Sequence, residues 1–343
     1  MFRGLSKWNV FVYLLNVLFA LVMLVAFLVP LVPANVFPYL SPLGLGIPVL
    51  VVLHLFFVCY WAVQWKRRLW LSVVLLLFGY FFMGSFFKVG FSSGENGPQD
   101  LKVMTYNVRG FNKWKAISES NIYNKIFDFI AMEDPDFICF QEVDYLKRGD
   151  FKKYPYQHLK YINNTNRVLL GIFSKYPIVD QGTLDWPNSI NNAAFADIAL
   201  KNDTIRVYNL HMESLRIVPE KAAVVAQPYD NVYKKLVKAF KKQSEQAAIF
   251  RAHRETVSYS SIVCGDFNNN QFSNAYRIIK GDMQDAFNQK GNGLGETYNF
   301  LGIPLRIDFI LSDPKWEVSA YKSYEVRYSD HFPVMASFRL SEN

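Results

Sequence analysis

The chain has 343 residues, of which 51% are hydrophobic, 17% aromatic and 19% charged. This composition excludes a disordered chain, a collagen and a disulfide-stapled miniprotein. Residues 1–99 hold six basic and one acidic side chain, a net charge of +5, whereas the rest of the chain holds 31 basic and 28 acidic ones, a net charge of +3. Because this second part is close to neutral, it is not a protein that coats nucleic acid non-specifically.

The first ninety residues are predicted to lie in a membrane. Residues 8–65 contain no charged side chain, and this run suits two spans of roughly 20 residues with a turn between them. Prolines and glycines break helices, and they cluster at residues 30–48. A cleaved signal peptide is shorter and would not precede further apolar runs. We therefore predict three transmembrane helices, near residues 8–30, 47–65 and 69–87.

The basic residues around these spans predict their orientation. Arg3 and Lys7 precede the first span, and residues 66–68 form a basic cluster between the second and the third. Positive side chains stay on the cytoplasmic side, so the N-terminus is predicted to be cytoplasmic and everything after the third span extracytoplasmic. We therefore expect an integral protein of the plasma or inner membrane, with an anchor at 1–88, a flexible linker at 89–100 and a soluble domain at 101–343.

The soluble part alternates between strand and helix patterns. We expect helices at 120–132, 233–255 and 273–279, and strands at 101–107, 136–143, 167–174, 193–200, 204–211, 261–264, 305–311, 318–328 and 333–340. The helix at 233–255 has a basic face. Strands in this number with few helices indicate one α/β domain of two packed sheets covered by helices.

Polar side chains occur in or directly after six of these strands. They are Asn107 in TYNVRG, Glu142 in QEVD, His211 in NLHMES, Asp266 and Asn268 in GDFNNN, Asp308 in RIDFIL, and Asp330 and His331 in SDHFPV. Taken singly, each is as consistent with a turn or a solvated side chain as with a site. Together they combine oxygen ligands suited to Mg²⁺ with two imidazoles suited to proton transfer.

In order and context, these six motifs resemble those of the endonuclease/exonuclease/phosphatase superfamily, over roughly residues 101–340. The resemblance implies an α/β fold that is a four-layer α/β/β/α sandwich, here preceded by the three transmembrane helices. It also implies a hydrolase of phosphate esters that depends on Mg²⁺, with Mn²⁺ as a substitute. The chain would then be a membrane-anchored member of bacterial type.

The resemblance also implies roles for individual residues. It assigns a metal site to Glu142, Asn107 and Asp330. It assigns catalytic roles to His331, Asp266, His211, Asp308 and Asn268. It assigns substrate contacts to Asn268, Asn209 and Arg109.

Two of these roles follow from elementary chemistry as well. Asp266 would orient a water for in-line attack on phosphorus. Asp308 would set the tautomer of His331 and favour its charged form. Whether His331 acts as a base or stabilises charge stays open.

The sequence leaves the substrate open between a phospholipid headgroup, as in sphingomyelinases, and a nucleic acid cleaved by an extracytoplasmic nuclease. A non-catalytic binding module is the least favoured alternative, because the metal glutamate and the histidine of SDH are both present. The long, partly apolar loop at 212–231 is expected to cap the site, to touch the bilayer or to be a simple crossover. The expected partners are a phosphate-ester substrate and the lipid bilayer, and no protein partner can be inferred.

Overall fold

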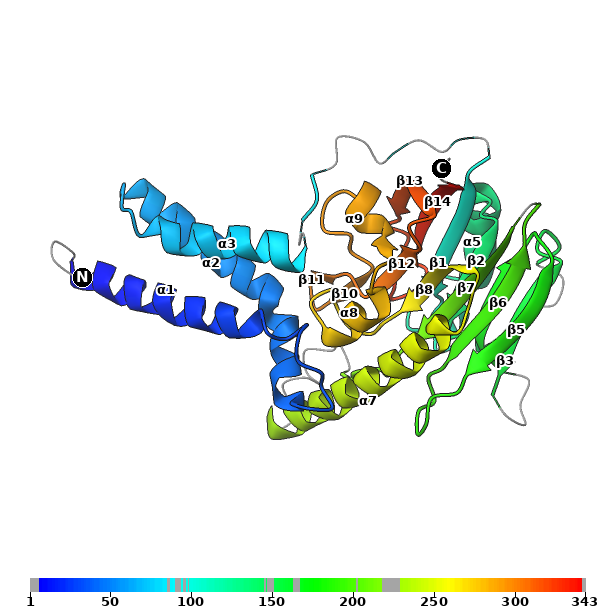
Figure 1. The fold of residues 1–343 in the computed structure, drawn as a ribbon, viewed down its shortest axis with the longest axis horizontal. Helices are drawn as coiled ribbons and strands as arrows, with labels where there is room; N and C mark the ends of the chain where they lie inside the picture. Colours follow the sequence, from blue (N-terminus) through cyan, green and yellow to red (C-terminus); the bar gives the residue numbers. More distant parts are fainter. Residues whose placement is uncertain are drawn as a thin grey trace.

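The computed structural model describes residues 6–84, 87–89, 94, 97, 99–144, 146, 151–162, 167–201, 203–217 and 229–340. A sandwich of two sheets forms the body, and three apolar helices extend from one side of it (Figure 1). Most of the linker predicted at 89–100 and residues 218–228 of the predicted loop lie outside the described residues.

The body contains two six-stranded mixed sheets. The first has the order β13 (Trp316–Ser323), β14 (Val334–Leu340), β1 (Leu101–Asn107), β2 (Phe137–Gln141), β4 (Val168–Ser174) and β3 (Tyr156–Tyr161). The second has the order β5 (Ile178–Leu184), β6 (Ala193–Ala199), β7 (Thr204–His211), β8 (Ser260–Asp266), β12 (Asp308–Ser312) and β9 (Gln284–Asp285). A small hairpin joins β10 (Tyr298–Phe300) and β11 (Ile303–Leu305).

The inner faces of the two sheets pack against each other, and helices cover the outer faces. These helices are α4 (Arg109–Asn112), α5 (Ile122–Glu133), α7 (Tyr229–Glu255) and α8 (Asn274–Lys280), whereas α9 (Ala286–Lys290) contributes Ala286 and Phe287 to the core between the sheets. Alternate residues of each strand point to opposite faces, so Val103 of β1 lies between the sheets while Met104 packs with α5. On the other outer face Val263 of β8 packs with α7 and α8. This arrangement is the α/β/β/α order that the motif resemblance implied.

Most predicted elements lie within two or three residues of their observed bounds, but four differences are informative. The strands β3 and β5 were not predicted, because they are partly exposed edge strands with a weak apolar alternation. The single strand predicted at 305–311 is divided between β11 and β12. The strand predicted at 318–328 ends at Ser323.

The apolar N-terminal part forms α1 (Lys7–Ala26), the 3-10 helix η1 (Pro38–Gly46), α2 (Ile47–Val63) and α3 (Leu69–Met83). Among the described residues, two helical stretches, Lys7–Ala26 and Pro38–Val63, are long and apolar enough to cross a membrane. The third predicted span is shorter than expected, because α3 has 15 residues and so measures only about 22 Å. The three long predicted spans are therefore corrected to two long candidates and one short apolar helix.

A buried polar network joins the three helices. The Ser72 hydroxyl of α3 accepts a hydrogen bond from Asn16 Nδ2 of α1 at 2.8 Å, and it lies 2.9 Å from His54 Nδ1 of α2. All three side chains are fully buried. A polar side chain among apolar ones costs free energy unless it is paired, so this network favours one arrangement of the helices.

A buried ion pair supports the strand that carries Asp308. The Arg306 guanidinium lies 2.8 Å from Asp285 Oδ2 at the end of β9, and both side chains are almost fully buried. Arg306 also lies over the rings of Phe287 and Phe309. The pair therefore joins α9, β9 and the start of β12.

We expect Arg306→Ala to destabilise the protein by about 3 kcal/mol or more, because it leaves the Asp285 carboxylate buried without its cation. Thermal and urea unfolding of the full chain in detergent would measure this loss. The matched control is Lys315→Ala, which removes a largely exposed partner of Asp203 and should cost less than about 1 kcal/mol. Equal losses in the two variants would contradict the expectation.

Candidate active site

The polar residues singled out in the sequence lie together at one edge of the sandwich, where strands β1, β7 and β8 end. β1 pairs with β2 in parallel, and β7 pairs with β8 in parallel. Asn107, His211 and Asp266 are the last residues of β1, β7 and β8. By the two-residue alternation of a strand they lie on the same face as the inner apolar residues before them. The apolar layer between the sheets therefore ends in a polar cluster.

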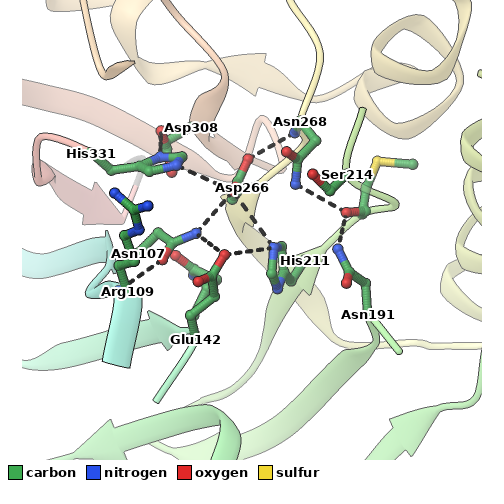
Figure 2. A network of polar contacts seen from close by, with 12 residues as sticks. Asn107, Arg109, Glu142, Asn191, His211, Ser214, Asp266, Asn268, Asp308 and His331 are labelled. Carbon is green, nitrogen blue, oxygen red and sulfur yellow. Dashed lines mark hydrogen bonds and ion pairs between the residues drawn. The ribbon is translucent and has the colours of Figure 1, made fainter. Parts of the chain in front are cut away.

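The Asp266 carboxylate lies at the centre of this cluster (Figure 2). Its Oδ2 accepts a hydrogen bond from Asn107 Nδ2 at 3.0 Å, and its Oδ1 accepts one from the Asn268 N–H at 2.7 Å. The Nε2 atoms of His211 and His331 each lie 3.7 Å from Oδ2. Four groups from different segments thus converge on one carboxylate.

Burial governs the ionisation of Asp266, which is only 1% exposed. Loss of solvation is the main cause that raises the pKa of this carboxyl to about 6, and the nearby His331 works against it. A carboxylate with a pKa closer to neutrality is a better proton acceptor than an ordinary aspartate.

His331 and Asp308 form a buried pair. The Nδ1–H of His331 donates to Asp308 Oδ2 at 2.9 Å, and Asp308 sits opposite Asp266 in the antiparallel register of β12 and β8. Burial alone would lower the pKa of the imidazole, but the Asp308 and Asp266 carboxylates outweigh it and raise the pKa of His331 to about 10. The imidazole is therefore charged at neutral pH.

Three residues around the cluster adopt left-handed backbone conformations. They are Arg109, Glu142 and Asn268, with φ of 43°, 54° and 49°. Such values are costly for side chains other than glycine and are found preferentially at functional sites. Each of the three follows a strand by one or two residues, so the chain turns sharply directly after the strands that carry the cluster.

Glu142 lies at the wall of a cleft of about 950 Å³, which His211 also lines. Its Oε1 accepts a hydrogen bond from Asn107 Nδ2 at 3.2 Å and lies 3.7 Å from His211 Nε2. Away from the cluster, the cleft is lined by both apolar and basic side chains. These are Trp114, Trp186 and Ile190, and Lys160, Arg167 and Arg216.

Arg109 and Asp330 form a side branch of the site. Arg109 Nη1 lies 3.1 Å from Asp330 Oδ2, and both side chains are partly exposed. The Arg109 N–H also donates to Asn107 Oδ1 at 3.1 Å. The carboxylate predicted to bind metal and the guanidinium predicted to bind substrate are thus paired with each other.

Asn209 lies below the site, between the two sheets. Its Nδ2 donates to the carbonyl oxygens of Phe140 at 2.8 Å and Gly171 at 3.0 Å, and its Oδ1 accepts from Gln141 Nε2 at 2.7 Å. The side chain is fully buried. We therefore assign it a role in holding the two sheets together rather than in contacting substrate.

Sequence reasoning missed three supporting residues. Gln141, next to Glu142, bonds to Thr105 and Asn209 beneath the site. Gln243 of α7 donates to the Asn268 carbonyl at 3.2 Å and accepts from Asn269 at 2.7 Å. Tyr298 of the hairpin packs against His331, with ring centroids 4.8 Å apart. A polar residue on an otherwise buried face was the available signal for Gln141.

The chemistry of the cluster suits a divalent cation. Among the described residues Asp266, Asp308 and His331 form a group that could hold a metal ion, with ligand atoms within 4.8 Å of one another. Asp308 Oδ1 is buried without a hydrogen-bond partner among the described residues. Glu142 offers a further carboxylate that is 45% exposed to the cleft. Carboxylate oxygens are the ligands that Mg²⁺ prefers.

Comparison with known proteins agrees with this geometry. Residues 104–331 match the endonuclease/exonuclease/phosphatase family. The chain belongs to this family. Residues 9–86 match a domain of unknown function, and no curated protein matches the chain.

Solved structures share the fold. The endonuclease/exonuclease/phosphatase of Bacteroides vulgatus is 20% identical, with a TM-score of 0.53 over 71% of this chain and 100% of that one. A humanized D. rerio TDP2 is 16% identical, with a TM-score of 0.53 over 70% and 99%. The human nocturnin catalytic domain is 15% identical, with a TM-score of 0.52 over 74% and 96%.

We expect Asn209→Ala to destabilise the protein by about 1–3 kcal/mol, because it removes the amide that bonds to two buried carbonyls and to Gln141. Thermal unfolding of the full chain would measure the loss. Asn231→Ala, which truncates an exposed side chain of α7, is the matched control and should change stability by less than about 0.5 kcal/mol. A tolerated Asn209→Ala would show that the polar layer contributes little.

Proposed function

We propose that the protein is a membrane-anchored, metal-dependent phosphoesterase that hydrolyses a phosphodiester or phosphomonoester by in-line attack of water. The observation that carries this proposal is the convergence of Asn107, His211, Asn268 and His331 on the buried Asp266 carboxylate. Family membership supports the same reaction class, because the matched region spans the whole cluster. An inert binding module would not need a charged carboxylate buried beside two imidazoles.

Asp266 is the group best placed to orient and deprotonate the attacking water. Its raised pKa makes it a competent base near neutral pH. The Asn107 and Asn268 hydrogen bonds hold its two oxygens in fixed directions. Asn107 is the last residue of β1 and Asn268 follows β8 by two residues, so the two sheets set the positions of both donors.

His331 is proposed to stabilise phosphate charge rather than to act as the base. Its pKa of about 10 keeps the imidazole protonated at neutral pH, and the Asp308 carboxylate fixes its orientation. Preorganised cations at a developing negative charge are usually the largest contribution to such catalysis. His211, with Nε2 between Glu142 and Asp266, is proposed to contact the same phosphate.

Glu142 and Asn107 are proposed as the principal residues that hold Mg²⁺ or Mn²⁺. Glu142 faces the cleft with a carboxylate that is 45% exposed and bonded to Asn107, and carboxylate oxygens are the ligands that Mg²⁺ prefers. Once bound, the cation would neutralise the phosphate and polarise its oxygens. Asp330 is a weaker candidate, because Arg109 already pairs with it.

The membrane anchor is supported by the apolar surface of α1, α2 and α3. Phe56 of α2 is 68% exposed and Phe81 of α3 is 81% exposed, and patches of this kind are unusual on a soluble monomer. The turn between α2 and α3, which carries Arg67 and Arg68, lies at the end of these helices away from the body (Figure 1). This placement agrees with a cytoplasmic turn and an extracytoplasmic body.

The metal assignment predicts different effects of two variants. Glu142→Gln should weaken Mn²⁺ binding, followed by electron paramagnetic resonance, and should reduce Mg²⁺-dependent phosphodiesterase activity by about 10²-fold or more. Asp308→Asn should reduce activity through His331 and change Mn²⁺ affinity less. Glu119→Gln on the surface is the control. If Asp308→Asn abolished Mn²⁺ binding while Glu142→Gln kept it, the ion would belong with Asp266, Asp308 and His331.

A substrate panel tests the reaction class. The full chain in detergent with Mg²⁺ would be given single-stranded DNA, RNA, sphingomyelin, phosphatidylinositol phosphates and an aryl phosphodiester. DNA is included because D. rerio TDP2, which shares the fold, is found with a single-strand DNA product. The phospholipids are included because the anchor would hold the site next to a bilayer. We expect hydrolysis of at least one phosphodiester, lost with EDTA and restored by Mg²⁺. No hydrolysis of any member would contradict the proposed function.

A further inference from the structure

The segment that follows Asp266 in the chain contacts the apolar N-terminal part. Residues 267–274 connect the end of β8 with α8. At the start of this segment the Asn268 N–H bonds to the Asp266 carboxylate, and Asn268 Nδ2 donates to the Met212 carbonyl at 3.0 Å. Whatever moves this segment therefore moves a direct partner of Asp266.

The far end of the same segment is bound by the loop between α1 and α2, residues 27–46. Asn270 Nδ2 donates to the Gly44 carbonyl at 3.0 Å, and Asn274 Nδ2 donates to the Pro30 carbonyl at 2.9 Å. Both asparagines are at least nine-tenths buried. Hydrogen bonds between buried groups are costly to leave unmade, so these two contacts hold the loop and the segment together.

Apolar packing reinforces the two hydrogen bonds. The ring of Phe272, between the two asparagines, is 2% exposed and belongs to the apolar cluster of the N-terminal helices rather than to the core of the sandwich. Its neighbours in that cluster include Phe27 and Ile47. A residue of the catalytic domain thus fills part of the core of the anchor.

A second element of the site touches the same loop. Tyr233 of α7 donates to the Tyr39 carbonyl at 2.9 Å, and the two rings are stacked. Ten residues further along α7, Gln243 bonds to the Asn268 carbonyl and to Asn269. We call residues 267–269 the Asn268 turn. The loop is therefore connected to this turn in two ways, through the hydrogen bond of Asn270 and through α7.

We propose that residues 30–44 of this loop are a positioning element of the catalytic centre, which fixes residues 267–269 and through them the Asp266 carboxylate. The anchor then has a part in catalysis beyond holding the enzyme at a membrane. The inference rests on the proposed hydrolytic function for its activity readout only. Asn270 is a positioning residue in this scheme, because it touches neither substrate nor metal.

Asn270 allows the contact with the loop to be removed separately from the local turn. Its Nδ2 serves the Gly44 carbonyl, whereas its Oδ1 accepts the Phe272 N–H at 3.1 Å. Asn270→Asp keeps the acceptor and removes the donor, whereas Asn270→Ala removes both. Asn9→Ala is the control, because Asn9 bonds to Gln64 and Tyr60 within the anchor and does not contact the catalytic domain in any described hydrogen bond.

The contact can also be opened from the side of the anchor. A Cβ on Gly44 would lie 3.0 Å from Val29 Cγ1 and 3.6 Å from the Phe272 carbonyl oxygen, whereas a Cβ on Gly46 would meet no heavy atom within 4 Å. Gly44→Val should therefore crowd Val29 and disturb the packing of the loop around the Gly44 carbonyl to which Asn270 bonds. Gly46→Val places the same side chain two positions along the chain and is its matched control.

The experiment measures hydrogen exchange and steady-state kinetics on the full chain in detergent with Mg²⁺ and an aryl phosphodiester. For Asn270→Asp and Gly44→Val we expect amide exchange at residues 266–270 to accelerate about tenfold or more, since local opening becomes easier. We expect kcat to fall about tenfold or more with KM nearly unchanged, since the reacting groups are displaced. Asn9→Ala and Gly46→Val should match the wild type in both measurements.

Two results would overturn the proposal. In the first, exchange rises at 270–274 but not at 266–269, and kcat is unchanged, so that the contact only docks two parts of the chain. In the second, all four variants lose activity equally and unfold at the same lowered temperature, which indicates a general loss of stability. If the wild type hydrolyses nothing, the proposed function fails, and the exchange at 266–269 still decides whether the loop controls the Asn268 turn.

Discussion

The structure depends on one constraint, which is that a charged carboxylate lies almost fully buried between two sheets. Asp266 is acceptable there only because Asn107, Asn268 and two imidazoles surround it. Asn107 and His211 end their strands, Asn268 follows β8 by two residues and His331 precedes β14 by three. The sandwich therefore has to bring several strand ends to a single edge. The parallel pairs β1–β2 and β7–β8 satisfy this requirement, because both end at the same place.

The same constraint explains the difference between the two histidines. His331 is buried beside Asp308 and Asp266, and two carboxylates around one imidazole favour its charged form. His211 lies between the buried Asp266 and the cleft-facing Glu142. One histidine is therefore fixed as a cation by the protein itself, while the other is arranged to meet what enters the cleft.

The sequence was most informative where periodicity and motif coincide. Strands such as β1, β7 and β8 were predictable, because apolar residues recur at alternate positions before a terminal Asn, His or Asp, although Thr105 and Asn209 are polar members of the inner faces. The edge strands β3 and β5 were not, because pairing and turns rather than burial define them. Roles such as that of Asn209 could not be predicted either, since a polar residue at a strand end has the same sequence pattern whether it faces the cleft or the other sheet.

The contact between the anchor and the Asn268 turn lies beyond the reach of local sequence patterns for a physical reason. Asn270 and Gly44 are 226 positions apart, and an asparagine-rich turn after a strand has its own local explanation in turn chemistry. Only the three-dimensional arrangement shows that these amides are used by a different part of the chain. If an anchor loop supplies part of the framework of a hydrolytic centre, then the orientation of the cleft relative to the anchor is constrained by the same hydrogen bonds that support catalysis. Detachment of the loop from residues 267–274 and loss of geometry at Asp266 would then be one event rather than two.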